Sequence, residues 1–317
     1  MPTPSEKHVE IAIVGGGPAG LSAAIWSARH MHSVAVVDSG EPRNQETREV
    51  KGYLGLDGVA PAELRARGRE SCRALGVNLV DGRVLHLEQR GDEDFLLCLE
   101  GGGRISCRRL LLAIGLRDVW PEVPGVADVY GANAHVCPDC DGYDSHGKKV
   151  VVIGTGRRAV GMALNLSTWT RDIIICTNGR PADMDEPEYY QKLDALNIPV
   201  ITEAISRVCE EGDRIHCIKL ANGMQLDTDK VFFAIGQYPA DDLGAQLGCE
   251  QDDEGHLVID DHGLTTVPNV YAAGDVTPGP QLAITAAARG ATAALAMHKS
   301  LVPEERKLTP LKLASAR

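Results

Sequence analysis

The chain has 317 residues, 44% of them hydrophobic but only 4% aromatic, and a formal net charge of −12. This length allows two domains with mostly aliphatic cores, and the acidic surface disfavours binding to nucleic acid or to anionic membranes. No apolar run approaches the roughly 18 residues of a membrane span, and the first apolar run, IAIVG, is too short for a signal peptide, so we expect a cytoplasmic protein.

The first predicted element is a buried strand at residues 9–14, followed by a glycine-rich turn and an alanine-rich helix at residues 21–30. The turn reads GGGPAG and fits GxGxxG, in which the first glycine permits a tight turn, the second admits a pyrophosphate, and the third lets helix and strand pack closely. The helix N-terminus offers unpaired N–H groups to the phosphates. We expect a dinucleotide to contact this turn at Gly15, Gly17, Pro18, Ala19 and Gly20.

A second strand at residues 33–37 leads into Asp38, where a carboxylate is expected to accept a hydrogen bond from an adenosine ribose hydroxyl. The order of strand, turn, helix, strand and acid favours dinucleotide binding over a glycine-rich turn without a ligand. A later strand, RLLLAIG at residues 109–115, is expected to return beneath the nucleotide, which brings Ala113 and Gly115 close to it.

The same pattern recurs in the middle of the chain. Residues 148–167 predict a strand, a turn containing Gly154 and Gly156, and a helix, and KVFFAIG at residues 230–236 repeats the return strand. Such self-similarity indicates an internal duplication of a dinucleotide-binding unit. The second helix begins with two basic residues that either clamp a pyrophosphate or are simply solvated, Arg157 and Arg158.

The last predicted elements are a short strand within residues 266–275 and an alanine-rich helix at residues 279–298. They are too small for a third domain and must complete the first. We therefore predict an α/β fold of two Rossmann-like, three-layer dinucleotide-binding domains, with the second inserted into the first. The predicted boundaries are residues 1–117 and 243–302 for the first domain, 118–242 for the second, and 303–317 for a flexible tail.

Seven of the nine cysteines are scattered, as is usual for small buried residues in a reducing compartment, but Cys137 and Cys140 form a CxxC motif. A zinc site needs four ligands, and even with His135 this site is short of them, so we expect no metal. A structural disulfide is disfavoured in a reducing compartment. A redox dithiol suits the residues best, because exchange needs an attacking thiolate and a resolving thiol within short reach.

The motifs GGGPAG, CPDCDG before the second glycine turn, and AAGD near the end resemble those of the low-molecular-weight thioredoxin reductases. The likeness runs from about Val9 to about Leu301, and a CxxC within the second domain distinguishes this family from glutathione-reductase-type enzymes. The resemblance implies a flavoprotein disulfide oxidoreductase with FAD in the first domain. In the parent family NADPH binds the second domain and the enzyme is a homodimer.

The resemblance also implies residue roles. Cys140 would be the sulfur next to the flavin, Cys137 the sulfur that attacks the substrate disulfide, and Asp141 the acid that handles the proton of the departing thiolate, although Asp141 also suits a helix cap. The flavin would lie against the N-terminus of the last helix, which stabilises negative charge. The further cofactor contacts predicted in the first domain are Arg43, Asn44, Val84, Gly274, Asp275, Gln281 and Leu282; those in the second are Gly154, Gly156, Arg157 and Arg158.

The sequence departs from the family at two places. Pro138 and Asp139 stand where Ala-Thr is common, and a carboxylate between two thiols disfavours their ionisation, so we expect Asp139 to favour the disulfide. Relatives that use NADPH carry a His-Arg-Arg cluster after the strand that ends here at Cys176. This chain has only Arg180 in that region, with acidic residues close behind it.

Three electron donors therefore stay open. The donor is NAD(P)H at the second site; or a second flavin or other redox partner replaces it; or a small dithiol passes electrons to oxygen. The stretch SGEPRN at residues 39–44 supports the dithiol donor, because it resembles the branch that contains the dithiol oxidases of natural-product pathways.

The expected partner is a small protein or a small-molecule disulfide or dithiol. A non-catalytic flavoprotein sensor is a hypothesis of another class, which the CPDCD motif disfavours.

Overall fold

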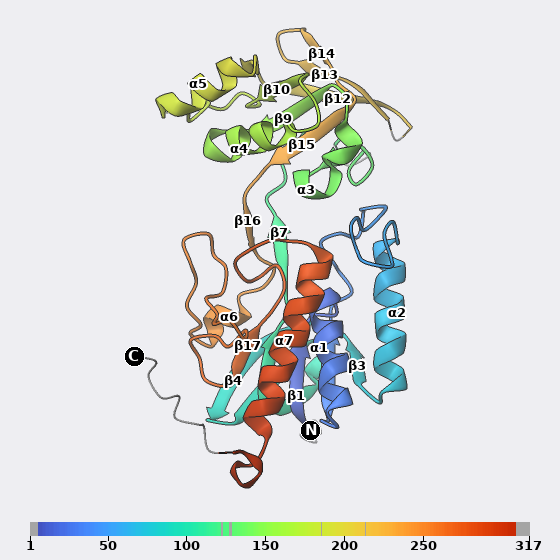
Figure 1. The fold of residues 1–317 in the computed structure, drawn as a ribbon, viewed down its shortest axis with the longest axis vertical. Coiled ribbons are helices and arrows are strands. Elements are labelled where there is room, and N and C mark those ends of the chain that lie inside the picture. Colours follow the sequence, from blue (N-terminus) through green and yellow to red (C-terminus); the bar gives the residue numbers. More distant parts are fainter. Residues whose placement is uncertain (1–5, 122, 127–128, 185, 213, 309–317) are drawn as a thin grey trace, which may run out of the picture. The chain divides into compact units, whose positions relative to one another are not determined.

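The computed structural model describes residues 6–308 except residues 122, 127–128, 185 and 213 (Figure 1). Two compact units make up the chain: Met1–Glu41, Arg65–Gly115 and Pro239–Arg317 form one, and Pro42–Leu64 with Leu116–Tyr238 form the other. The second unit interrupts the first, and the α/β fold class is confirmed. The segment Pro42–Leu64 was assigned to the first domain from the sequence, but its contacts group it with the second unit.

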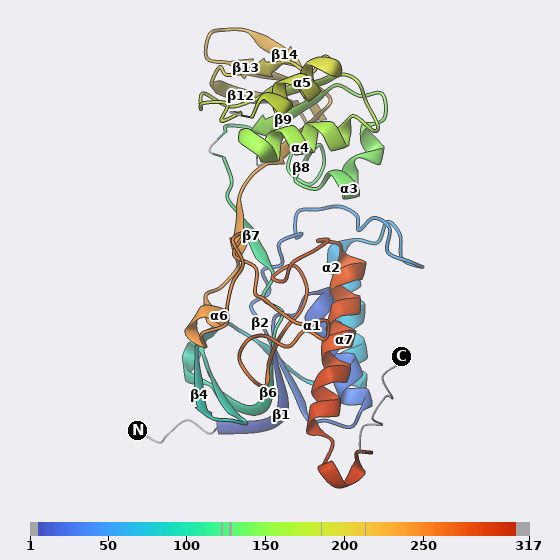
Figure 2. The same ribbon diagram turned by 60° about the vertical axis from the view of Figure 1, so that its left-hand side comes forward.

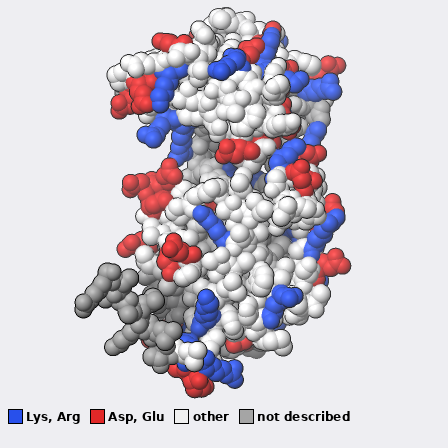
Figure 3. All heavy atoms as spheres, in the orientation of Figure 1, with Lys and Arg blue, Asp and Glu red and all other residues white. Residues whose placement is uncertain are grey.

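The predicted tail lies partly outside the described residues. Its first part contains a short 3-10 helix, η3, at Glu304–Arg306, and residues 309–317 are not described. No described helix has both the length and the apolar character that a membrane crossing requires. Figure 3 shows Asp and Glu side chains interspersed with Lys and Arg side chains, so the acidic excess is not gathered into one patch on the face in view.

The first unit is built on a seven-stranded sheet in the order β3-β2-β1-β6-β5-β4, with β17 also paired to β6. The pairings along β3-β2-β1-β6 and between β6 and β17 are parallel, whereas β4-β5-β6 is antiparallel. The strands are β1 (Glu6–Val14), β2 (Val34–Asp38), β3 (Asn78–Asp81), β4 (Val84–Gly91), β5 (Asp94–Leu99), β6 (Arg104–Leu112) and β17 (Val270–Ala272).

One edge of β6 pairs with two different strands along its length. Residues 104–107 pair with β5, and residues 110–112 pair with β17, while the other edge pairs with β1 throughout. Residues 9–14 of β1 and the whole of β2 are buried with little interruption, which is typical of a parallel sheet covered on both faces. The late strand β17 thus completes the sheet begun at the N-terminus.

Helices α1 (Pro18–Arg29) and α7 (Ala283–Leu301) lie side by side on this sheet, although they come from opposite ends of the chain (Figures 1 and 2). Their contact is close because it is lined with small residues: a Cβ added to Gly290 would overlap the backbone oxygen of Ala19. The remaining helices of the first unit are α6 (Leu243–Gln246), η1 (Glu100–Gly102) and most of α2 (Pro61–Ala74).

The second unit contains a five-stranded parallel sheet in the order β11-β10-β9-β15-β8 and a three-stranded antiparallel sheet β12-β13-β14. The parallel strands are β8 (Ala134–His135), β9 (Val150–Gly154), β10 (Ile173–Cys176), β11 (Val200–Ile201) and β15 (Lys230–Ala234). The antiparallel strands are β12 (Ile205–Glu211), β13 (Arg214–Leu220) and β14 (Gln225–Asp227). Its helices are α3 (Pro138–Asp141), η2 (Tyr143–Ser145), α4 (Gly156–Leu166) and α5 (Pro187–Ala195), and the two chain crossings pair as β7 (Leu116–Asp118) and β16 (Gln237–Pro239).

Candidate redox and nucleotide sites

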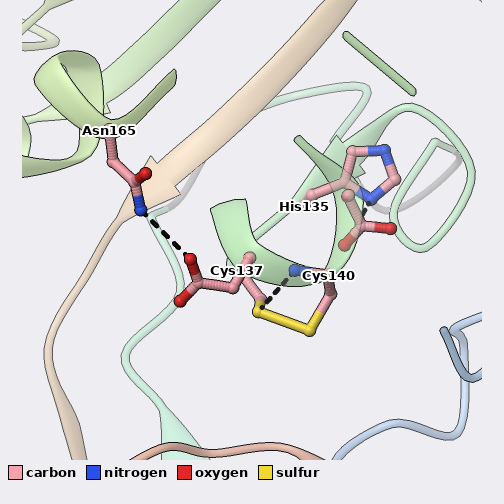
Figure 4. Close-up of a disulfide and its surroundings, with 6 residues drawn as sticks. His135, Cys137, Cys140 and Asn165 are labelled. Atoms are coloured by element: carbon pink, nitrogen blue, oxygen red, sulfur yellow. Dashed lines mark hydrogen bonds and ion pairs between the residues drawn. A yellow bond between two sulfur atoms is a disulfide. The ribbon is translucent and has the colours of Figure 1, made fainter. Parts of the chain in front are cut away.

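Cys137 and Cys140 are joined by a disulfide at the start of α3, with their Cα atoms 5.4 Å apart (Figure 4). Cys137 occupies the N-cap position, and its Sγ accepts a hydrogen bond of 3.1 Å from the backbone N–H of Cys140. Pro138 fits the next position, where the missing N–H would have no partner within the helix. Both cysteines are partly exposed. An N–H aimed at Cys137 Sγ stabilises a thiolate there, because a charged acceptor strengthens the bond.

The two aspartates around the pair have different surroundings. Asp139 is exposed and accepts a hydrogen bond of 3.3 Å from Asn165 Nδ2 on α4 (Figure 4). Asp141 ends α3 and is 15% exposed, and its Oδ2 lies 3.3 Å from Nδ1 of His135. The N-cap of α3 is Cys137 and that of η2 is Gly142, so Asp141 is the N-cap of neither.

The predicted glycine turn of the first unit has the geometry of a phosphate cradle. Gly15 has φ +107°, and a Cβ there would overlap the backbone oxygen of Ala113, while a Cβ on Gly20 would overlap the oxygen of Gly15. A Cβ on Gly17 would meet no atom within 4 Å. Helix α1 begins with Pro18 and has no side-chain cap, so its first N–H groups are available to an anion. These residues fit the pyrophosphate of a dinucleotide.

Asp38, the predicted ribose acceptor, ends β2 and is held by two arginines of α2. Its Oδ2 accepts hydrogen bonds of 2.7 Å from Arg65 and 3.1 Å from Arg69, and its Oδ1 accepts one of 3.2 Å from the N–H of Gly40. Burial opposes ionisation, but the hydrogen bonds from Arg65 and Gly40 prevail and hold the pKa of Asp38 below its ordinary value. Arg65 Nε is buried and has no hydrogen-bond partner in the described part of the chain, so it offers a donor to a ligand at this place.

The sequence did not identify Arg65 and Arg69, although their spacing of four residues places them on one face of α2. Among the predicted residues, Gly274 (φ +88°) approaches α1, since a Cβ there would lie 3.0 Å from Ala19 Cβ. Leu282 is the N-cap residue of α7 and does not cap it with its side chain. The loops around the sheet ends also carry Ala113, Gly115, Asp275 and Gln281.

Three further predicted contacts have other surroundings. Val84, at the start of β4, is buried in the hydrophobic cluster that contains Val14. Arg43 and Asn44 belong to the second unit, where Arg43 donates hydrogen bonds of 3.0 and 2.8 Å to the carboxylate of Asp118. The predicted contact of Arg43 and Asn44 with the cofactor stays a prediction.

The second glycine turn borders a cavity of about 420 Å³ at the carboxyl ends of β9, β10 and β15. Ligands of open α/β sheets bind at such a place. The cavity carries two cations and an apolar wall, and its lining includes Thr155, Arg158, Asn178, Arg180, Val119 and Trp120. Arg157, the other basic residue that begins α4, is exposed and does not line it.

Part of the phosphate cradle at this second turn is occupied by the chain itself. The N–H of Gly156 donates a hydrogen bond of 2.8 Å to the backbone oxygen of Ala182, and a Cβ on Gly156 would lie 3.2 Å from the oxygen of Asp183. Asn178 Oδ1 accepts a hydrogen bond of 2.8 Å from the N–H of Ile205. Arg158 and Arg180 still line the cavity, but the second turn offers fewer free backbone N–H groups to a phosphate than the first.

Within the described ranges, no group of three or more His, Cys, Asp or Glu side chains is arranged to hold a metal ion.

Comparison with known proteins gives a match to the family model described as pyridine nucleotide-disulphide oxidoreductase over residues 9–290. A probable thioredoxin reductase of Arthroderma benhamiae is 26% identical over 96% of this chain and 83% of its own length. An NADH dehydrogenase of Ferdinandcohnia aciditolerans is 30% identical over 97% of this chain, which spans only 60% of that protein. Among solved structures, HlmI is 34% identical with a TM-score of 0.88, and 93% of both chains is covered.

Proposed function

The chain belongs to the pyridine nucleotide-disulphide oxidoreductase family as a thioredoxin-reductase-like flavoprotein enzyme, and from this we propose that it catalyses thiol–disulfide exchange at Cys137 and Cys140. In this proposal the pair passes electrons between FAD and an external disulfide or dithiol. The observation that carries it is the N–H of Cys140 aimed at Cys137 Sγ, because it favours the thiolate that must attack a substrate.

FAD binding follows from the family, and the first unit offers a site that fits it. Bound FAD supplies two-electron redox chemistry. We assign its pyrophosphate to the turn at Gly15 and Gly17 and the N-terminus of α1, and its adenosine end to the side of Asp38 and Arg65. At the other end, the N-terminus of α7 supplies N–H groups, and the residues assigned there are Asp275, Gln281 and Leu282.

The exchange itself uses side chains of the second unit. With the pair reduced, the Cys137 thiolate attacks one sulfur of an external disulfide, and the other sulfur leaves as a thiolate that takes a proton from Asp141. Cys140 then attacks the mixed disulfide at Cys137 and releases the second substrate thiol. The external disulfide gains two electrons from the pair and two protons, one from Asp141 and one from the Cys140 thiol, as the disulfide of the pair forms.

For the electron donor, the cavity with Arg158 and Arg180 supports an anionic nucleotide, and NAD(P)H is the first candidate. The hydrogen bond between the Gly156 N–H and the Ala182 oxygen favours a second candidate, a nicotinamide-independent enzyme that takes electrons from a small dithiol. Anaerobic mixing with NADPH, NADH or a dithiol, followed at the 450 nm flavin band, separates the two. Bleaching by a nicotinamide supports the first, bleaching by dithiol alone supports the second, and no bleaching by any of them contradicts both and favours a sensor.

Cysteine variants test the exchange site. Cys137→Ser and Cys140→Ser should each abolish turnover of a disulfide or dithiol while bound FAD stays at the wild-type level. Cys98→Ser, which changes a partly exposed free cysteine of the first unit, is the matched control and should keep full turnover. Turnover above a few per cent in either serine variant of the pair would refute the assignment.

We also propose a cytoplasmic homodimer, as the family resemblance implies. The seven cysteines outside the pair are free thiols, which suits a reducing compartment. Light scattering on the purified protein tests the assembly, and a mass of one chain would contradict it.

A further inference from the structure

Three side chains of the second unit form a chain of contacts that ends next to the redox pair. His135 lies with Nδ1 3.3 Å from Oδ2 of Asp141 and with Nε2 3.2 Å from Nζ of Lys230. His135 is 6% exposed and Lys230 is 9% exposed. The two residues come from paired strands, since β8 and β15 place His135 beside Phe232, and Asp141 directly follows Cys140. The contact chain therefore joins a buried lysine to the acid beside the pair.

The hydrogen-bonding capacity of these groups fixes where the protons lie. An ammonium has three donors and no acceptor, so a charged Lys230 must donate to a lone pair on Nε2 of His135. The neutral imidazole then carries its proton on Nδ1, which lies 3.3 Å from Oδ2 of Asp141. Each link thus has its donor on the side of Lys230 and its acceptor on the side of Asp141.

The surroundings of Lys230 favour the release of its proton. Burial lowers the pKa of Lys230, and it outweighs the opposite effect of the carboxylates of Asp144 and Asp141, while the charges of Lys51 and Lys148 add smaller lowering effects. Lys51 itself forms an ion pair of 3.3 Å with Asp144. The ordinary pKa is about 10.4 for lysine and about 8.5 for a thiol. A lower pKa of Lys230 lies closer to that of a thiol, so the free-energy cost of moving a proton from Lys230 to a departing thiolate is smaller.

The geometry points to a buried proton relay in which Lys230 and His135 supply Asp141 with the proton that a departing substrate thiolate takes up. This inference rests on the proposed exchange at Cys137. As the substrate S–S bond breaks, its electron pair goes to the departing sulfur. The Nδ1 proton of His135 passes to the Asp141 carboxylate, which delivers a proton to that sulfur, while Nε2 of His135 takes a proton from Lys230. The Lys230 amine regains its proton from solvent, and dithiol oxidation runs the relay in reverse.

In this scheme Asp141 contacts the reacting sulfur, and Lys230 and His135 are positioning residues that act through it. The test must therefore separate proton delivery from a merely structural role. Disulfides whose leaving thiols differ in acidity do this, because a strongly acidic thiol leaves as a stable thiolate and needs no proton. Bis(2-hydroxyethyl) disulfide has a weakly acidic leaving thiol, and 5,5′-dithiobis(2-nitrobenzoic acid) has a strongly acidic one.

The experiment uses the full FAD-loaded protein, reduced anaerobically with dithiothreitol, freed of excess reductant and mixed with each disulfide in a stopped-flow instrument. Lys230→Met and His135→Gln should slow exchange with the alkyl disulfide by about 100-fold and leave the aromatic disulfide within about threefold, since general acid catalysis contributes at least that much. Lys149→Met removes an exposed neighbouring lysine that has no part in the relay and should leave both rates unchanged. Equal slowing with both disulfides, or no slowing with either, would overturn the relay.

Two further results keep the test decisive. If both variants fail to fold, the wild-type protein alone decides: the relay predicts a larger solvent deuterium isotope effect with the alkyl than with the aromatic disulfide, and equal effects overturn it. Reduced Cys137→Ser tests the premise separately. If that variant still exchanges at the wild-type rate, the proposed function fails; if exchange requires Cys137 but does not depend on Lys230 and His135 as stated, only the relay fails.

Discussion

Gly17→Ala should weaken FAD binding while leaving the fold of the flavin-free protein intact. Gly17 has φ −79° and ψ −174°, an extended conformation that any residue adopts, and a Cβ there would meet no protein atom within 4 Å. The added methyl group therefore costs nothing by overlap with the protein. It would stand in the open space over the N-terminus of α1, where the pyrophosphate is expected to approach the backbone.

The two effects differ in size. Gly17 is the N-cap residue of α1, and alanine is a poorer N-cap than glycine, so the flavin-free protein should lose about 1 kcal/mol of stability or less. A hydrogen bond to a charged group contributes about 1.5–3 kcal/mol. Displacing the phosphate from one N–H should therefore raise the Kd for FAD by about 10- to 100-fold, at 1.4 kcal/mol for each factor of ten.

The assay is titration of the flavin-free protein with FAD, followed by flavin fluorescence, together with a thermal unfolding curve without flavin. Gly161→Ala is the matched control, because Gly161 lies on α4 and a Cβ there also meets no atom within 4 Å. This control should gain about 1 kcal/mol from helix propensity and keep the wild-type Kd. A Gly17→Ala protein with a Kd within twofold of wild type would refute the assignment of the phosphate site.

Three other substitutions test neighbouring parts of the argument. Asp139→Thr should raise the reduction potential of the disulfide by about 10–20 mV, because one exposed negative charge near the sulfurs is removed; an unchanged potential in a redox titration would contradict this. Asp38→Asn should lower the free energy of unfolding at pH 7. Because the folded-state pKa of Asp38 lies below its ordinary value of 3.8, its ionic contribution is present above that value and lost as pH falls through the folded pKa, so the loss measured in urea should shrink below pH 4. Gly290→Ala should destabilise the protein by about 1–3 kcal/mol through overlap with Ala19, although alanine is the better helix former, and a raised Tm would show that the α1–α7 contact can relax.

The duplicated fold was predictable because its signals are local. Each glycine turn, the strand before it and the helix after it lie within about 20 residues, and the structure has β1–α1 and β9–α4 at these places. The antiparallel strands β4–β5 and β12–β14 were not identified, because their exposed faces are polar and their pairing partners are set by tertiary contacts. The last helix begins at Ala283 rather than at Gly279, where φ is +115° and the chain has not yet become helical.

The sites were predictable only in part, because sequence patterns identify residues that are close in the chain but not residues that meet through the fold. The CxxC motif lies within four residues, and the structure places both cysteines at the start of one helix. The arginines that hold Asp38 come 27 and 31 residues after it, and no short pattern links them to the carboxylate. The open second turn was expected from its glycines, but the backbone of Ala182 that meets Gly156 belongs to a loop with no recognisable motif.

The duplication also shows why Lys230 calls for a functional explanation. The two return strands, RLLLAIG and KVFFAIG, each begin with a buried basic residue, Arg109 in the first unit and Lys230 in the second. Arg109 is neutralised structurally, by an ion pair of 2.8 Å with Glu93 and a hydrogen bond of 2.8 Å to Ser300. Lys230 has no carboxylate within ion-pair distance among the residues that the structure describes, and its hydrogen-bond partner is the ring of His135. A buried ammonium held only by an imidazole is costly as a structural element. The same arrangement is useful where a proton must leave the lysine, which is the role that the relay gives to Lys230.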